Sequence, residues 1–238
     1  MAKRAEQSNA ALEQAVLPFG VPPVRYAAAD YLISQSNDEA WRMATGWLGG
    51  EAFGLVISGP AGAGKTHLAL VLESHAPGTR VQIVDDALSA APDVLLDRLC
   101  DIELAGQRVI LTGRGDPQDW SEGLADLRTR LNAMARVCLP DPDETLIVGV
   151  LNKMFADRQW SIDPEISAFV APRIPRTFAA AKIFVETCDQ EMMRKGSKLT
   201  KQNAKTIAAK LFDQDQPVST TPEISQANCE GLGHDTRR

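Results

Sequence analysis

The chain has 238 residues, enough for one substantial domain or for a core domain with a small satellite. Hydrophobic residues make up 44% and charged residues 24% of the sequence, a balance that excludes a chain disordered throughout. The net charge of -6 excludes a surface that is basic everywhere and binds nucleic acid as a whole, although it permits a local basic patch.

The cysteines and the N-terminus argue against a zinc protein, a disulfide-rich secreted protein and a membrane protein. No CxxC pair is present, so we expect neither a zinc site nor a disulfide framework. Reduced cysteines that mostly serve packing are expected instead, among Cys100, Cys138, Cys188 and Cys229. The N-terminus lacks the pattern of a signal peptide, and no apolar run approaches the ~20 residues of a membrane span. We therefore expect a cytoplasmic protein that does not contact a membrane.

The first segment, 1–24, is polar and alanine-rich and ends in PFGVPP. This composition predicts a flexible arm closed by a proline-stiffened stretch, with the folded domain beginning near Arg25. The arm contains QAVLPF at 14–19, which suits neither a helix nor a strand. Taken alone, this hexapeptide fits a linker that packs one phenylalanine on its own core.

An amphipathic helix is expected over 37–48. Its apolar residues recur at the i, i+3, i+4, i+7 spacing of one helix face, at Ala40, Met43, Ala44 and Trp47. The glycines at 49 and 50 mark its end.

Short apolar runs and helical segments alternate over the next part of the chain. The runs lie at 53–58, 81–84, 108–112 and 136–140, and the helical segments at 66–74 and 92–105. Alternating strands and helices predict an α/β domain at 25–140 with a parallel sheet covered on both faces.

After Pro140 the pattern is helical only. We expect a small all-α second domain at 141–212, with helices at 141–158, 163–171, 177–195 and 200–212. Asp141 and Asp163 each precede a proline, as N-cap residues do, and Thr200 is the expected cap of the last helix. Residues 213–238 are rich in Gln, Ser, Thr and Pro, which predicts a disordered tail.

GPAGAGKT at 59–66 is a complete P-loop, G-x4-G-K-[ST], between a strand and a helix. Its glycines, Gly59, Gly62 and Gly64, let backbone N–H groups turn inward around a phosphate. Lys65 is expected to reach the terminal phosphates, and the Thr66 hydroxyl to ligate magnesium. The expected ligands are therefore ADP or ATP with Mg²⁺.

Two acidic residues follow the second strand run. Asp85 suits the metal and Asp86 the orientation of an attacking water, although both also suit a cap for the next helix. The short spacing between Thr66 and Asp85 leaves room for one helix and no extra strand, so the core is shortened. Thr112 and Arg114 lie at the end of the run at 108–112, which would form the strand between those at 53–58 and 81–84. Either suits a phosphate sensor, and a plain hydrogen bond at the strand end is an equal alternative.

Five stretches occur here in the order and spacing of a known family: YLISQSN, GPAGAGKTHL, VDD, ADLRTRL and PRTFAAAK. They make the chain similar, over roughly 14–212, to the DnaA-related AAA+ proteins. Within this family it most resembles the short Hda-type regulators, which inactivate the replication initiator DnaA. Residues after 212 show no helix-turn-helix pattern, so we expect the regulator rather than the initiator.

The resemblance assigns roles to several residues. Ser36 and Asn37 would line the adenine pocket, a role compatible with capping the first helix. Arg130 would be an arginine finger acting in trans on a partner's ATP, with Arg128 as its rival and a solvated arginine as the plain alternative. Arg176 would reach back to the nucleotide from the helical domain, unless it forms a surface salt bridge.

Hda-type proteins carry near their N-terminus a peptide that inserts into the sliding clamp. The matching residues here are Gln14, Leu17, Pro18 and Phe19. Leu17 and Phe19 suit buried anchors, and Pro18 limits the entropy lost on binding. The implied partners are the clamp, DnaA, DNA indirectly through the clamp, and a second copy of the chain.

Three functions share these features. The first is a nucleotide-bound regulator that docks on the clamp and stimulates ATP hydrolysis by DnaA. The second is a self-contained AAA+ ATPase such as a helicase loader, and the third is a nucleotide-dependent adaptor without hydrolysis.

Charge is uneven in the helical domain. Residues 173–210 carry nine basic and three acidic residues, a balance of 9 - 3 = +6. This stripe suits DNA or an acidic partner, or a solvated helix face.

Overall fold

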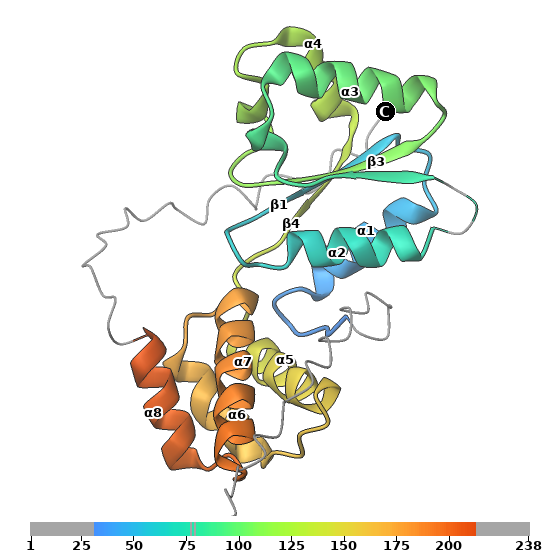
Figure 1. Cartoon of the computed structure of the whole chain (residues 1–238). Coiled ribbons are helices and arrows are strands. Elements are labelled where there is room, and N and C mark those ends of the chain that lie inside the picture. The colour runs from blue at the N-terminus through green and yellow to red at the C-terminus, as the bar shows by residue number, and fades with distance from the viewer. Residues whose placement is uncertain (1–30, 77, 79, 213–238) are drawn as a thin grey trace, which may run out of the picture.

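The structure is a computed structural model that describes residues 31–76, 78 and 80–212. It contains a parallel sheet between two layers of helices, followed along the chain by a group of helices (Figure 1). The start expected near Arg25 and the tail at 213–238 lie outside the described residues. So do the residues predicted to bind the clamp, Gln14, Leu17, Pro18 and Phe19.

Four short strands form the sheet, and all of their pairings are parallel. They are β1 (Gly54–Ser58), β2 (Val81–Val84), β3 (Arg108–Gly113) and β4 (Ala135–Cys138). Their order across the sheet is β2-β3-β1-β4, so β3 lies between the P-loop strand and the strand before the acidic pair. The predicted α/β class with a shortened parallel sheet is confirmed.

Side-chain alternation places helices on both faces of the sheet. Leu55 and Ile57 of β1 enter one core, whereas Val56 between them enters the other. The first core is covered by α1 (Asp38–Leu48) and α2 (Lys65–Ser74), and the second by α3 (Pro92–Leu104) and α4 (Ala125–Ala133), as Figure 1 shows. Two 3-10 turns, η2 (Ala87–Ser89) and η3 (Asp119–Ser121), lie in the connections.

Helix α1 follows the predicted pattern with one exception. Ala40, Ala44 and Trp47 are buried against the sheet, but Met43 is half exposed. The end of α1 is fixed from β3, because the Arg108 guanidinium donates hydrogen bonds to the carbonyls of Trp47 (2.7 Å), Leu48 (3.1 Å) and Ala52. The same guanidinium lies 3.8 Å from the centre of the Trp47 ring. Arg108 thus satisfies helix-terminal carbonyls that have no partner within the helix.

The second part of the chain, here called the lid, is all-α as predicted. It comprises α5 (Glu144–Asp157), α6 (Pro164–Val170), the 3-10 turn η4 (Ala171–Arg173), α7 (Phe178–Lys195) and α8 (Lys201–Phe212). Its apolar core includes Phe155, Phe184 and Cys188. Burial raises the pKa of the Cys188 thiol to about 12, which fits the packing role expected of it. No helix in the described part of the chain is long and apolar enough to cross a membrane.

The caps of the lid helices correct one prediction. The cap predicted at Asp141 is wrong, because α5 starts later and Asp143 is its N-cap, accepting a hydrogen bond from Leu146 N–H at 2.6 Å. Asp163 caps α6 as predicted, with Pro164 at the first helical position. Thr200 caps α8 through Asn203 N–H (3.2 Å).

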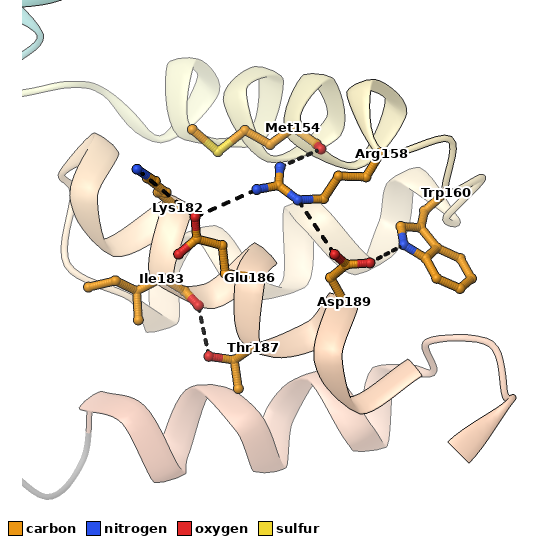
Figure 2. Close-up of polar contacts among 8 residues, drawn as sticks. All are labelled: Met154, Arg158, Trp160, Lys182, Ile183, Glu186, Thr187 and Asp189. Carbon is orange, nitrogen blue, oxygen red and sulfur yellow. Dashed lines mark hydrogen bonds and ion pairs between the residues drawn. The ribbon is translucent and has the colours of Figure 1, made fainter. Parts of the chain in front are cut away.

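A polar network joins the end of α5 to α7 (Figure 2). The Arg158 guanidinium lies between the carboxylates of Glu186 (3.7 Å) and Asp189 (3.9 Å) and donates to the Met154 carbonyl. Asp189 also accepts a hydrogen bond from the Trp160 indole N–H at 2.6 Å. These contacts hold the α5–α6 connection against α7 and make the lid one packed unit.

We predict that Arg108→Ala lowers the free energy of unfolding by about 2 kcal/mol or more, since it leaves several partly buried carbonyls without a charged donor. Chemical denaturation followed by circular dichroism measures this change. Arg98→Ala, which removes an exposed arginine from α3, is the control and should change stability by less than about 0.5 kcal/mol. Equal effects of the two substitutions would contradict the helix-capping role of Arg108.

Candidate nucleotide-binding site

The P-loop connects β1 to α2 at the carboxyl edge of the sheet. Gly59 (φ 149°), Gly62 (φ 78°) and Gly64 (φ 90°) adopt backbone angles that side chains rarely allow. Space is also lacking: a Cβ atom on Gly59 would lie 2.3 Å from the Leu139 carbonyl oxygen. The glycines therefore permit a turn that L-residues disfavour and a close approach to the strand beside them.

The other two glycines contact the lid. A Cβ atom on Gly62 would lie 2.7 Å from the Thr177 side chain, and one on Gly64 would lie 2.4 Å from the Phe178 ring. Phe178 N–H also donates a hydrogen bond to the Gly62 carbonyl at 3.3 Å. The start of α7 is thus packed directly on the P-loop.

Lys65 extends back over the P-loop. Its ammonium group donates hydrogen bonds to the carbonyls of Gly59 (2.9 Å) and Pro60 (2.7 Å). Partial burial, and then the nearby charge of Arg114, lower the pKa of this ammonium. A cation held by two neutral carbonyls inside a glycine turn can exchange them for phosphate oxygens, which accept stronger hydrogen bonds.

The residues predicted to hold magnesium lie together. The Thr66 hydroxyl donates to Asp85 Oδ1 at 2.8 Å, which brings a hydroxyl and a carboxylate from α2 and the end of β2 into contact. Mg²⁺ in phosphate sites takes one or two such protein oxygens and completes its shell with phosphates and water. This donor set fits Mg²⁺, and no richer cluster of metal-ligating side chains occurs within 31–76, 78 and 80–212.

Thr112 and Arg114, the two candidates for phosphate sensing, have different positions. The buried Thr112 hydroxyl donates to Asp85 Oδ1 at 2.5 Å and accepts from Asp86 N–H at 3.0 Å. Thr112 therefore orients the carboxylate that is predicted to hold the metal. Arg114 is exposed, and its charge acts on Lys65.

Asp86 directly follows the metal-site acid in an unusual backbone conformation. Its φ of 48° and ψ of 62° lie in the left-handed region, which non-glycine residues seldom occupy and which is enriched at functional sites. It precedes η2 without a side-chain capping bond, and the Asp85 carboxylate accepts hydroxyl groups instead. The alternative that the side chains of this acidic pair cap the following helix is therefore wrong. Asp86 occupies the N-cap position of η2 only with its backbone.

The segment before α1 is fixed by its own polar side chains. Asn37 is buried, accepts from Ser34 N–H at 2.7 Å and donates to the Leu32 carbonyl at 2.9 Å. It occupies the N-cap position of α1, as expected, but its side chain forms no capping bond to the helix. Its donation to the Tyr31 hydroxyl (3.4 Å) extends the same network.

Ser36 links this segment to the lid. Ser36 N–H donates to Asp143 Oδ2 at 3.1 Å, and Asp143 N–H donates back to Ser36 Oγ at 3.3 Å. Because Asp143 is also the N-cap of α5, the segment and the first lid helix share one anchor. Ser36 and Asn37 thus shape the loop in which the adenine pocket is predicted, and both side chains already have protein partners.

Sequence reasoning did not identify an aromatic cluster beside this loop. Tyr31 stacks on Trp41 with ring centres 4.8 Å apart and meets the His67 ring edge-on at 5.6 Å. Burial raises the pKa of Tyr31 to about 12. The tyrosine directly before the polar run LISQSN was the available signal, but its partners come from α1 and α2.

Arg176 is exposed immediately before the N-cap of α7, Thr177. Arg176 is therefore next in the chain to Thr177 and Phe178, the residues that contact the P-loop. The structure brings together seven of the predicted residues: Gly59, Gly62, Gly64, Lys65, Thr66, Asp85 and Asp86.

Arg130 belongs to the other layer of the fold. It lies in the last turn of α4 and forms an ion pair with Glu103 of α3, on the face of the sheet away from α1 and α2 (Figure 1). The hydrogen bond to Glu103 raises the pKa of its guanidinium, and its side chain is about one-third exposed, at 34%. Arg128, its rival, is exposed on the same helix.

No protein-family model matches the sequence, and a search among curated proteins finds no match either. Solved structures match by fold. Domain III of the replication initiation protein DnaA from Thermotoga maritima superposes with a TM-score of 0.68 and 17% identity, over 76% of this chain and 95% of that domain.

Two further structures extend the likeness. A single-residue variant of RuvB from Thermotoga maritima has a TM-score of 0.62 and 13% identity, over 80% of this chain and 73% of RuvB. The replication initiator DnaA bound to AMPPCP and single-stranded DNA has a TM-score of 0.55 and 15% identity, over 74% of this chain and 69% of that DnaA chain. At these identities the likeness establishes the fold alone, and this chain shares the fold of DnaA domain III and RuvB.

Proposed function

We propose that this chain is a nucleotide-bound regulator of replication initiation, which docks on the DNA-bound sliding clamp and stimulates ATP hydrolysis by DnaA. Its main support is the separation of two sites on one fold. The phosphate-binding residues gather at the carboxyl edge of the sheet, whereas Arg130 lies on the α3–α4 layer with Glu103 as its ion-pair partner. An arginine in this position suits a nucleotide held by another molecule.

The chain's own nucleotide, ADP or ATP, would be held by the P-loop, Lys65 and Thr66. When bound, Mg²⁺ would neutralise phosphate charge, with Thr66 and Asp85 as its protein ligands. Since Thr177 and Phe178 pack on the loop that wraps the phosphates, nucleotide binding would also fix the position of the lid. The nucleotide then serves as a structural ligand.

Arg130 would act on the initiator's ATP. A rigid guanidinium stabilises charge that develops on a transferring phosphoryl group. The ion pair with Glu103 keeps the Arg130 side chain near the surface. Because both side chains are partly exposed, this ion pair contributes little free energy. Arg130 can therefore exchange Glu103 for phosphate oxygens when a partner docks.

The clamp peptide would come from the arm. QAVLPF provides two apolar anchors, Leu17 and Phe19, a stiffening Pro18 and the hydrogen-bonding Gln14. Among the fold neighbours, DnaA is named a replication initiator, and this likeness supports a role in replication for the chain. The arm, the AAA+ fold and the position of Arg130 together favour a regulator.

A second function, a self-contained ATPase such as a helicase loader, is favoured by a different observation. Thr66, Asp85 and Thr112 form a continuous hydrogen-bonded set, and Asp86 follows next to it, as hydrolysis of the chain's own ATP would require. ATP turnover by the purified chain without partners separates the possibilities. Steady turnover favours the loader, while bound nucleotide without turnover favours the regulator or a non-hydrolysing adaptor.

For the phosphate site, we predict that Lys65→Ala weakens ADP binding about 100-fold or more, because charge-assisted hydrogen bonds to phosphate are lost. Calorimetric titration with ADP and Mg²⁺ measures the change in Kd. Lys182→Ala, at an exposed position on α7, is the matched control and should bind like the parent. Unchanged affinity in a folded Lys65→Ala protein would refute the site.

For the arm, we predict that the double variant Leu17→Ala, Phe19→Ala weakens binding to purified clamp about 100-fold or more, since two buried anchors are removed. Val21→Ala with Val24→Ala removes apolar residues from the same arm outside the hexapeptide and should leave binding intact. Surface plasmon resonance with immobilised clamp compares the three proteins. Equal binding by all, or binding by none, would overturn clamp docking.

For the arginine finger, we predict that Arg130→Ala lowers the stimulated rate of ATP hydrolysis by DnaA about 1000-fold, the lower end of the effect of such fingers elsewhere. The assay contains the clamp loaded on DNA, DnaA with radiolabelled ATP, and this protein. Glu103→Gln removes the ion-pair partner but keeps Arg130, and it should still stimulate. If Arg128→Ala abolishes stimulation and Arg130→Ala does not, the finger is Arg128.

A further inference from the structure

The surface of the lid contains a groove that the nucleotide site does not use. Helices α7 and α8 lie side by side (Figure 1), and a cavity of about 250 Å³ opens between them. One stripe of α7 lines it with residues at i, i+4 and i+7 spacing, and one stripe of α8 faces it at i, i+3 and i+7 spacing. These residues are Thr187, Glu191 and Arg194, and Asn203, Thr206 and Lys210.

The charge of this groove is positive. The Glu191 carboxylate is matched by Arg194 at 2.9 Å. Lys198, in the connection between the helices, and Lys210 also line the groove, and both are exposed. Within the described residues neither lysine belongs to an ion pair, and α8 has no acidic residue. Two uncompensated cations therefore converge on one cavity of a chain whose net charge is -6.

The uncharged lining indicates what kind of anion would fit. Asn203 has a side-chain amide of the kind that donates to phosphate and sugar oxygens, whereas the Thr187 and Thr206 hydroxyls donate to helix carbonyls and add polar, uncharged surface. Among the described residues no aromatic side chain lines the groove, so they offer no surface on which unpaired bases stack. This combination fits the backbone of duplex DNA better than single-stranded DNA.

We propose that the α7–α8 groove is a site for the phosphate backbone of duplex DNA, with Lys198 and Lys210 as its main charges. Binding is independent of sequence, because the groove presents side chains to phosphates and sugars rather than to base edges. The lid thereby touches DNA directly, which goes beyond the indirect link to DNA through the clamp.

The test uses the full chain and a fluorescent 30-base-pair duplex, without clamp or DnaA, so its outcome is independent of both. Anisotropy titrations from 50 to 200 mM salt give the affinity and its salt dependence. Each phosphate contact contributes about -0.9 to the slope of log K against log salt. The variant Lys198→Ala, Lys210→Ala is expected to bind at least about tenfold more weakly at 100 mM salt, with a slope smaller by about two.

The matched control, Arg98→Ala with Lys182→Ala, changes the net charge equally but away from the groove, and it should bind like the parent. The proposal is overturned if the two double variants bind alike, or if the parent does not bind duplex at 50 mM salt. Tighter binding of a single strand of equal length also overturns it. The proposal is likewise overturned if polyglutamate displaces the labelled duplex as well as unlabelled duplex of equal charge does, since the groove would then suit an acidic protein segment.

Discussion

The contact between the P-loop and the start of α7 is the constraint on which the candidate nucleotide site depends. Gly62 and Gly64 leave only the space that Thr177 and Phe178 fill, and a single Cβ atom at either glycine would overlap them. The loop that would wrap a phosphate therefore has the lid as one of its walls. A ligand that shifts this loop must also shift the lid, which gives a bound nucleotide a structural effect without any hydrolysis.

A second contact, between the loop before α1 and the start of α5, adds to the contact between the P-loop and α7. Ser36 and Asp143 donate hydrogen bonds to each other, and these bonds join the loop before α1 to the first lid helix. The proposed adenine and phosphate regions are thus each tied to the lid by separate contacts. Two attachment points define an angle between lid and sheet, whereas one would act as a hinge.

The division of charge over the fold follows from the sheet architecture. Parallel strands end at one edge, which gathers Thr66, Asp85 and Thr112 into one hydrogen-bonded set. Alternation of side chains sends α3 and α4 to the other face, and Arg130 with them. The lid adds a third surface between α7 and α8 whose cations lie apart from both.

The sequence by itself determined the features that depend on near neighbours along the chain. The P-loop, the four strand runs, the lid helices and the caps at Asp163 and Thr200 were predictable, because each rests on spacings of a few residues. The α5 cap was misplaced by two residues: Asp143 caps the helix through Leu146 N–H and also accepts a hydrogen bond from the distant Ser36.

Only the tertiary structure decided which distant residues meet. Nothing near Gly64 in the chain indicates Phe178, nothing near Arg130 indicates Glu103, and the partners of Asn37 in the loop before α1 give it a role that the motif alone did not reveal. Such contacts arise when apolar faces pack and bring polar groups together across the fold. Their partners are set by the arrangement of whole helices and strands, which local spacing does not encode.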